Sequence, residues 1–146
     1  MSHYYLPFLF QGLFMMVDEF FFHRKRFIPR WEHIGHPLDT LTTMLTLLIP
    51  VLLPFNDQSS MVYLTLAIFS SLFITKDEFV HKDYCSKIEH WLHAVLFILH
   101  PVTFFCAYFM WINNTGLGFL TLQVSLIGIF LIYQIYQWIK SHETRK

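Results

Sequence analysis

Two similar patterns of acidic and histidine residues recur in this chain. Each begins with an Asp-Glu pair and a histidine after two or three further residues, and continues seven or eight residues later with Glu-His-x-x-His. Carboxylates and imidazoles without a thiolate suit iron, manganese or zinc, so the repeat predicts a metal site. The ten candidate ligands are Glu19, His23, Glu32, His33, His36, Glu78, His81, Glu89, His90 and His93.

Helical spacing would bring these side chains together. Glu19 and His23 are four residues apart, and Glu78 and His81 are three apart, so each pair would share one helix face. At 100° per residue, each Glu-His-x-x-His unit spans an arc of about 100°. Asp18 and Asp77 lie about 100° off the glutamate face, Asp39 has no counterpart in the other pattern, and His100 lies about three turns deeper. We expect these four residues to support the ligands rather than bind the metal.

The charges of this cluster indicate how many ions it would hold. Ionisable side chains inside a membrane helix are costly and by default face the bundle interior with a partner. Ten of them at one level would repel one another, or go unsatisfied, without a cation between them. Four carboxylates can bridge and neutralise two ions, so the expected cofactor is a pair of divalent metal ions. Iron is the favoured identity, with zinc or manganese as alternatives.

The elements that must position these residues are apolar helices. The 146 residues are 55% hydrophobic and 14% charged, with a mean hydropathy of +0.45, whereas soluble domains have about 25% charged residues. Crossing a bilayer takes roughly 20 helical residues, because backbone groups in lipid must bond internally. The third apolar stretch is too short unless its helix continues into residues 76–81. The predicted fold class is all-α integral membrane, with five transmembrane helices at about residues 4–22, 38–55, 61–75, 91–112 and 117–139.

All ten Lys and Arg residues fall on one side of a five-span arrangement. They follow the first span, surround the connection between the third and fourth, and close the chain. The positive-inside rule then predicts an external N-terminus and a cytoplasmic C-terminus, as in a multi-pass protein of a bacterial inner membrane. The first apolar stretch has no basic region before it and no small-residue cleavage pattern after it. We therefore expect it to remain as a membrane helix.

Residues 1–146 are expected to form a single membrane domain. The repeat is a helical hairpin used twice, at about residues 4–55 and 61–112, and its four helices would form a bundle. The extra helix at about residues 117–139 lies outside the repeat. Pro37 disfavours helical geometry in the residue before it. Glu32 and His33 could therefore lie on the second helix or on a preceding loop.

The ligand set resembles, in its logic, that of the ferritin-like di-iron carboxylate proteins. In that family four helices each contribute a glutamate, and two of them add Glu-x-x-His. The many histidines at a membrane edge also resemble those of the membrane fatty-acid desaturase and hydroxylase superfamily. The H-x-x-x-H and H-x-x-H-H boxes of that superfamily do not occur here. These resemblances imply a di-iron centre that activates oxygen at the cytoplasmic membrane edge.

The leading hypothesis is therefore a di-iron oxidoreductase of oxygenase type, with a lipid-soluble substrate and a redox partner. Non-redox metal transport, storage or sensing is an alternative, as is haem held by facing histidines such as His36 and His93, so enzymatic activity stays open. A net charge of zero gives no basic surface for nucleic acid. Cys85 and Cys106 form no C-x-x-C pair, so neither a disulfide framework nor a thiolate zinc site is expected. The pattern specifies no oligomeric state.

Overall fold

The structure, a computed structural model, describes residues 2–23, 30–79 and 85–143 of the chain. Five α-helices account for most of these residues, and no strand occurs within the described ranges. The all-α prediction is therefore confirmed. The elements are η1 (Ser2–Tyr5), α1 (Leu6–Val17), η2 (Asp18–Phe22), α2 (Arg30–Leu52), α3 (Asp57–Phe73), η4 (Ile74–Asp77), α5 (Lys87–Ile112) and α6 (Leu117–Glu143).

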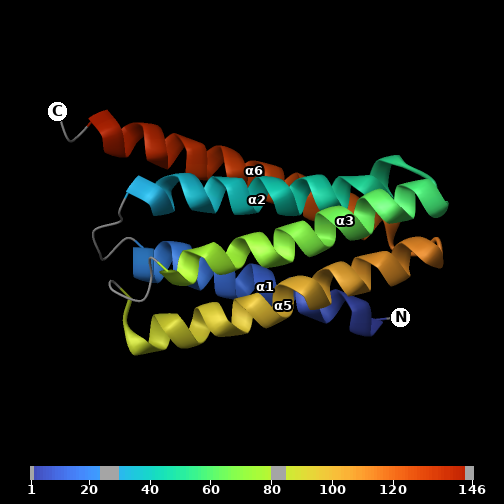
Figure 1. Ribbon diagram of the computed structural model, residues 1–146, viewed down its shortest axis with the longest axis horizontal. Coiled ribbons are helices and arrows are strands. Elements are labelled where there is room, and N and C mark those ends of the chain that lie inside the picture. The colour runs from blue at the N-terminus through green and yellow to red at the C-terminus, as the bar shows by residue number, and fades with distance from the viewer. Residues whose placement is uncertain (1, 24–29, 80–84, 144–146) are drawn as a thin grey trace.

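The five α-helices run in alternating directions along the long axis of the molecule (Figure 1). α2 packs against α6 and α3, while α1 packs against α5. α6 lies outside the sequence repeat, yet it packs against α2 as part of the same bundle. The end of η2, the start of α2, the end of η4 and the start of α5 gather at one end of the molecule, which we call the site end.

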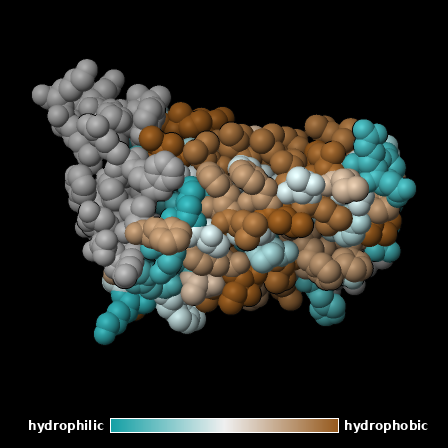
Figure 2. Space-filling model, in the orientation of Figure 1, coloured by the Kyte–Doolittle hydropathy of each residue, from teal (hydrophilic) through white to brown (hydrophobic). Residues whose placement is uncertain are grey.

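Four helices are long and apolar enough to cross a membrane. The third apolar stretch reaches the necessary length because η4 continues α3 through Asp77, as its sequence required. The face of the molecule in Figure 2 is largely hydrophobic along its middle, with hydrophilic residues toward the two ends. Among the described residues, the four candidate spans are His3–Phe22, Asp57–Asp77, Lys87–Ile112 and Leu117–Gln137.

α2 differs from these four because many of its polar side chains are buried between helices. Thr40, Thr43 and Thr46 are buried, and the Thr40 hydroxyl donates a hydrogen bond of 2.7 Å to Gln134 Oε1 on α6. Thr43 donates to the carbonyl of Asp39 in its own helix at 2.8 Å. A helix enclosed by other helices does not need an apolar face on every side, which accounts for the lower hydropathy of α2.

Two helices begin before their apolar stretches. α2 starts at Arg30 and continues through Pro37, so the backbone at Glu32 and His33 is helical. α5 starts after Ser86, whose Oγ accepts the Glu89 N–H while Glu89 Oε2 accepts the Ser86 N–H, both at 3.3 Å. This reciprocal pairing is a capping box, which fixes the first turn of a helix. Both helices therefore carry their candidate ligands on helical backbone.

The end of the bundle opposite the site end holds a cluster of packed aromatic rings, and we call it the aromatic end. The ring centroids of Tyr63 and Trp111 lie 5.7 Å apart, and those of Phe55 and Trp111 lie 5.1 Å apart. The Tyr63 hydroxyl donates to the Phe104 carbonyl at 2.7 Å, and Trp111 Nε1 donates to the Leu53 carbonyl at 3.0 Å. Aromatic packing with satisfied polar groups thus joins α2, α3 and α5 at this end.

Candidate metal centre

Four buried side chains converge at the site end of the bundle. Asp18, His23, Glu89 and His93 each offer one ligand atom, and these atoms all lie within 4.8 Å of one another. Asp18 begins η2 and His23 directly follows it, at the end of the first candidate membrane span, while Glu89 and His93 lie in the first turns of α5. We call these four residues the metal group. They could hold one metal ion between two carboxylates and two imidazoles.

A short π-helix explains why Asp18 belongs to the metal group. η2 is a turn of π-helix, and the His23 N–H bonds to the Asp18 carbonyl five residues earlier. Residues five apart therefore lie near one another, with His23 Nδ1 at 3.7 Å from Asp18 Oδ2 and 3.8 Å from Glu19 Oε2. The α-helical spacing of the sequence analysis paired His23 with Glu19 alone. Single π-helical turns are frequent at functional sites.

Regular α-helix supplies the other half of the metal group. Glu89 and His93 are four residues apart on α5, so their side chains share one face. The capping box with Ser86 anchors one oxygen of Glu89 at the start of the helix. Glu89 therefore has a structural role in addition to any role as a ligand, and the two roles can be separated by substitution.

The electrostatics of the metal group favour a cation at its centre. His93 Nε2 lies 3.0 Å from Asp18 Oδ1, and the His23 and His36 rings pack edge to face with centroids 4.6 Å apart. Carboxylates that meet in a buried space repel each other unless a positive charge lies between them or one is protonated. A divalent ion would supply two positive charges between Asp18 and Glu89, and the imidazoles of His23 and His93 could serve as its other ligands.

The second Asp-Glu pair is placed quite differently. The Glu78 side chain is 52% exposed, and its Oε1 lies 3.6 Å from Nδ1 of His90, outside the metal group. Asp77 is buried, but its Oδ1 pairs with Lys76 Nζ at 3.0 Å. The same ammonium group bonds to both oxygens of Asp39, at 2.6 and 2.7 Å.

The remaining candidate ligands are placed as follows. Glu19 and His36 lie beside the metal group and line the adjacent cavity. His33, on α2, is partly buried and lies outside the metal group. The side chain of Glu32, and the whole of His81, lie outside the described residues.

Deeper in the bundle, His100 belongs to a hydrogen-bonded chain that crosses four helices. Its Nδ1 lies 2.9 Å from Gln11 Nε2, and its Nε2 lies 3.0 Å from Ser70 Oγ. Ser70 Oγ in turn lies 2.9 Å from the Thr42 hydroxyl. Sequence reasoning missed Gln11, Ser70 and Thr42, because single polar residues in an apolar helix match no spacing pattern.

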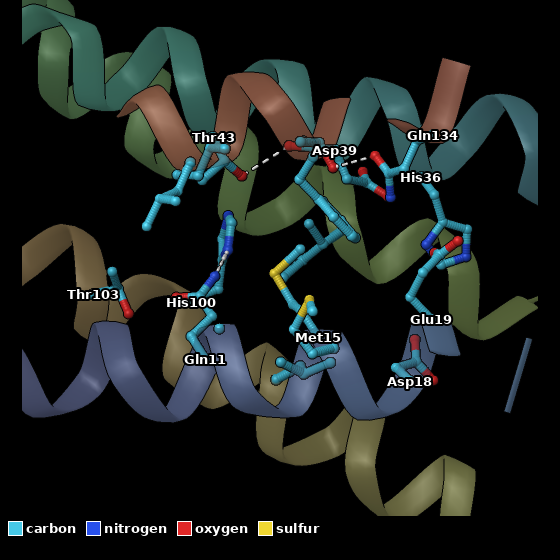
Figure 3. A pocket seen from close by; sticks show the side chains of 18 of the residues that line it. Gln11, Met15, Asp18, Glu19, His36, Asp39, Thr43, His100, Thr103 and Gln134 are labelled. Carbon is cyan, nitrogen blue, oxygen red and sulfur yellow. Dashed lines mark hydrogen bonds between the residues drawn. The ribbon is translucent and has the colours of Figure 1, made fainter. Parts of the chain in front are cut away.

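A cavity of about 600 Å³ adjoins the metal group. Asp18, His36 and His93 line one end of it, and Gln11 and His100 line the other. Figure 3 shows these two polar ends, with the Met15 side chain between them. Most of the remaining lining is apolar and comes from α1, α5 and α6. The volume falls within the range of about 300–1,000 Å³ typical of small-molecule sites.

No protein-family model, curated protein or solved structure matches this chain. The metal group, the cavity and the candidate membrane spans are therefore the features of this chain that bear on its function. Together they define an all-helical protein with candidate membrane spans and a buried group of four side chains that could bind a metal ion.

Proposed function

We propose that this chain is a membrane-embedded di-iron oxidoreductase that oxidises a lipid-soluble substrate. The observation that carries the proposal is the convergence of Asp18, His23, Glu89 and His93 beside a largely apolar cavity. Carboxylate and imidazole ligands without thiolate suit iron, with manganese or zinc as the other metals of this class. An apolar cavity next to the ligands suits a hydrocarbon substrate better than a water-soluble one.

A second ion would lie on the side of the metal group that faces α2. The His36 ring packs against His23, and Glu19 Oε2 lies 3.8 Å from His23 Nδ1. Both residues also line the cavity. Glu32, whose side chain lies outside the described residues, stays a ligand predicted from the sequence pattern alone. Two ions sharing these ligands would neutralise the acidic residues gathered at this end.

The reaction that we propose inserts one oxygen atom into a substrate C–H bond. Dioxygen takes four electrons: two from the C–H bond that becomes C–OH, and two, with two protons, from an electron-carrier protein in the cytoplasm. The second oxygen atom leaves as water. The iron pair, when bound, supplies the activation of dioxygen. Asp18, His23, Glu89 and His93 would hold the ions, the Ser86 cap would orient Glu89, and the apolar cavity wall would exclude water from the substrate.

We infer that α2 also spans the membrane, which makes five spans, with the N-terminus outside and the site end cytoplasmic. The buried threonines of α2 support this inference because they keep its polar groups away from lipid. The basic residues Lys76 and Lys87 lie at the site end, in agreement with the positive-inside rule. Reporter fusions after Lys146 and near Asp57 test the topology. A C-terminal fusion that reports an external location would contradict it.

Metal transport and haem binding receive less support. The aromatic end closes the bundle with packed rings, so the polar chain through His100 meets an apolar barrier beyond it. The imidazoles of His23, His36 and His93 pack against one another, with centroids 4.6 and 6.4 Å apart. Such close packing favours compact ions over a porphyrin held between facing histidines.

Metal analysis of the purified protein, combined with absorption spectroscopy, tests the proposal. We expect two irons per chain, no Soret band, and a spectral change when anaerobically reduced protein meets air. Hard carboxylates stabilise the ferric pair, while neutral imidazoles keep the ferrous state accessible. Two zinc ions per chain, a Soret band, or a reduced di-iron form that stays unchanged in air for hours would each overturn the oxidoreductase proposal.

A further inference from the structure

We propose that the cavity beside the metal group binds a neutral, lipid-soluble alcohol. Its hydroxyl group would lie at Gln11, and its hydrocarbon chain would extend between α1 and α6 toward Asp18 and His93. The binding site is inferred from the cavity itself. That the bound alcohol is the substrate rests on the function proposed above.

We call the boundary along which α1 and α6 face each other the seam. Aromatic contacts close it near both ends, and it is open in its middle. Phe8 contacts Phe119 with ring centroids 5.2 Å apart, and Phe20 contacts Tyr133 at 5.3 Å. Between them lies Gly12, which lines the cavity, and an added Cβ there would meet nothing within 4 Å. The seam therefore leaves a gap at this glycine.

The cavity opens to the outer surface of the bundle along this seam. Met16 of α1 and both Leu126 and Ile129 of α6 line the cavity, and each is about half exposed or more, at 49%, 50% and 65%. Their position in candidate membrane spans means that this exposed surface would face lipid. A membrane-dissolved molecule could thus enter sideways, without passing through water.

The inner end of the cavity calls for a hydrogen-bond donor on the ligand. Gln11 is only 8% exposed, and its Nε2 contacts His100 Nδ1 at 2.9 Å. Among the described residues, no group donates a hydrogen bond to Gln11 Oε1. Thr43 and Thr103, at the same end in Figure 3, each donate their hydroxyl proton to a carbonyl one turn earlier in their own helix at 2.8 Å. The hydroxyl oxygens and Gln11 Oε1 therefore offer lone pairs, which a ligand hydroxyl would match.

The other end of the cavity disfavours an anionic ligand. The carboxyl groups of Asp18, Glu19, Asp39 and Asp77 all belong to lining residues, and Lys76 pairs with the last two. No Lys or Arg belongs to the described residues that line the cavity, and Lys76 is already paired, so a fatty acid or phosphate head group would lack a cationic partner in this low-dielectric region. A neutral alcohol avoids this cost while keeping the hydrogen bond to Gln11.

The distance between the two ends of the cavity determines which carbon of the ligand's hydrocarbon chain would lie beside the metal group. Gln11 and Asp18 are seven residues apart on one helix, which corresponds to about 10 Å along its axis. A hydrocarbon chain anchored at Gln11 would thus bring a carbon about 10 Å from its hydroxyl close to Asp18 and His93. The length of the cavity therefore determines which carbon of the ligand lies beside the metal group.

Two variants separate the features of this site. Gly12→Leu places a side chain in the gap of the seam, where an added Cβ would meet nothing within 4 Å. Gln11→Leu removes the hydrogen-bonding group at the inner end. Gly118→Leu is the matched control for the first variant, since Gly118 also has open space around it and lies outside the cavity. None of these residues belongs to the metal group.

Photoaffinity labelling tests the proposal in protein reconstituted in lipid bilayers. The probe is a twelve-carbon primary alcohol with a diazirine in its chain, and the matched probe is the same alkane without the hydroxyl. Peptide mass spectrometry measures labelling at Ile127, which lines the cavity, relative to Ile132, which is 69% exposed and lies outside it. We expect the alcohol to label Ile127 preferentially in the unchanged protein and in Gly118→Leu.

Gly12→Leu should abolish this preference for Ile127. Gln11→Leu should lower it about two- to tenfold, the value of one hydrogen bond, for the alcohol but not for the alkane. Equal labelling of both positions in the unchanged protein, or a preference that survives Gly12→Leu, would overturn the cavity proposal. Iron content measured in the same samples separates the two proposals. Specific labelling of iron-free protein supports the cavity and contradicts the di-iron function, whereas di-iron protein without specific labelling does the reverse.

Discussion

The two ends of the helical bundle are built on opposite principles. At the aromatic end, rings from α3, α5 and the connection between α2 and α3 pack together, and the buried Tyr63 hydroxyl and Trp111 indole each donate a hydrogen bond to a backbone carbonyl. At the site end, carboxylates and imidazoles converge around a cavity of about 600 Å³. Helices in lipid associate through close packing and hydrogen bonds rather than through the hydrophobic effect. One end can therefore supply the packing that lets the other keep an open, charged site.

This difference implies that the two ends respond differently to substitution. Changes at the site end should alter metal or ligand binding more than they alter folding. Changes at the aromatic end should lower stability while metal stoichiometry stays the same. A chain of hydrogen bonds through Ser70 lies between the two ends, and its loss should lower stability.

The largest expected effect follows from Glu89→Gln. Glutamine can still form the capping box with Ser86, but it removes the carboxylate charge from the metal group. Even residues that only support metal ligands cost about 10–100-fold in affinity when changed. We therefore expect at least about a 100-fold loss of iron affinity, measured by metal titration of the purified protein.

Glu78→Gln is the matched control, because Glu78 is 52% exposed and lies outside the metal group. It should keep full metal content. Full metal content in Glu89→Gln would show that Glu89 acts as a helix cap alone, and loss of metal in Glu78→Gln would extend the ligand set to the second Asp-Glu pair.

A smaller effect, on stability, is expected from Ala107→Leu at the aromatic end. Ala107 is fully buried in the aromatic cluster, at 0% exposed, so a larger side chain must displace its neighbours. Overpacking of this kind costs about 1–3 kcal/mol. Thermal unfolding should shift to lower temperature, with iron stoichiometry unchanged below the transition. Ala94→Leu, at an exposed position of the same helix, should leave unfolding unaltered. Loss of iron from folded Ala107→Leu would contradict the independence of the two ends.

Ser70→Ala should destabilise the region between the two ends. Its Oγ bridges His100 Nε2 at 3.0 Å and the Thr42 hydroxyl at 2.9 Å, and it is fully buried. Removing a buried bridge of this kind costs about 1–2 kcal/mol. Chemical unfolding in detergent measures the loss, with Ser71→Ala as the neighbouring control. A neutral result for Ser70→Ala would mean that the polar chain contributes nothing to holding the helices together.

Tyr63→Phe is expected to have the smallest effect. It removes one interhelical hydrogen bond to the Phe104 carbonyl and keeps the ring contacts. Single hydrogen bonds between membrane helices average about 0.6 kcal/mol. The same unfolding measurement should give a loss of this order, while Tyr136→Phe, at an exposed position, should give none. A loss of several kcal/mol would show that the hydrogen bond, rather than ring packing, holds the aromatic end.

The sequence alone determined the helical class and the approximate positions of the helices, and it named three of the four residues that gather in the metal group. Apolar stretches of membrane length require helices, because lipid offers no partner for backbone groups. Glu89 and His93 were predicted correctly as neighbours, since residues four apart share a face wherever the helix is regular. His23 was identified by its place in the repeat. These conclusions rest on local periodicity, which sequence records directly.

Only the tertiary structure decided which helix faces meet. The π-helical turn at Asp18–Phe22 brings Asp18 alongside His23, whereas α-helical spacing had assigned Asp18 a supporting role. Glu78 repeats the pattern of Glu19 in sequence, yet it lies exposed beside His90 rather than in the metal group. The cavity lies beside α6 at Gly12 of α1, where the missing side chain leaves a gap between the two helices. Periodicity fixes which residues share a face of one helix, but the contacts between helices depend on packing among residues distant in sequence, which no local pattern contains.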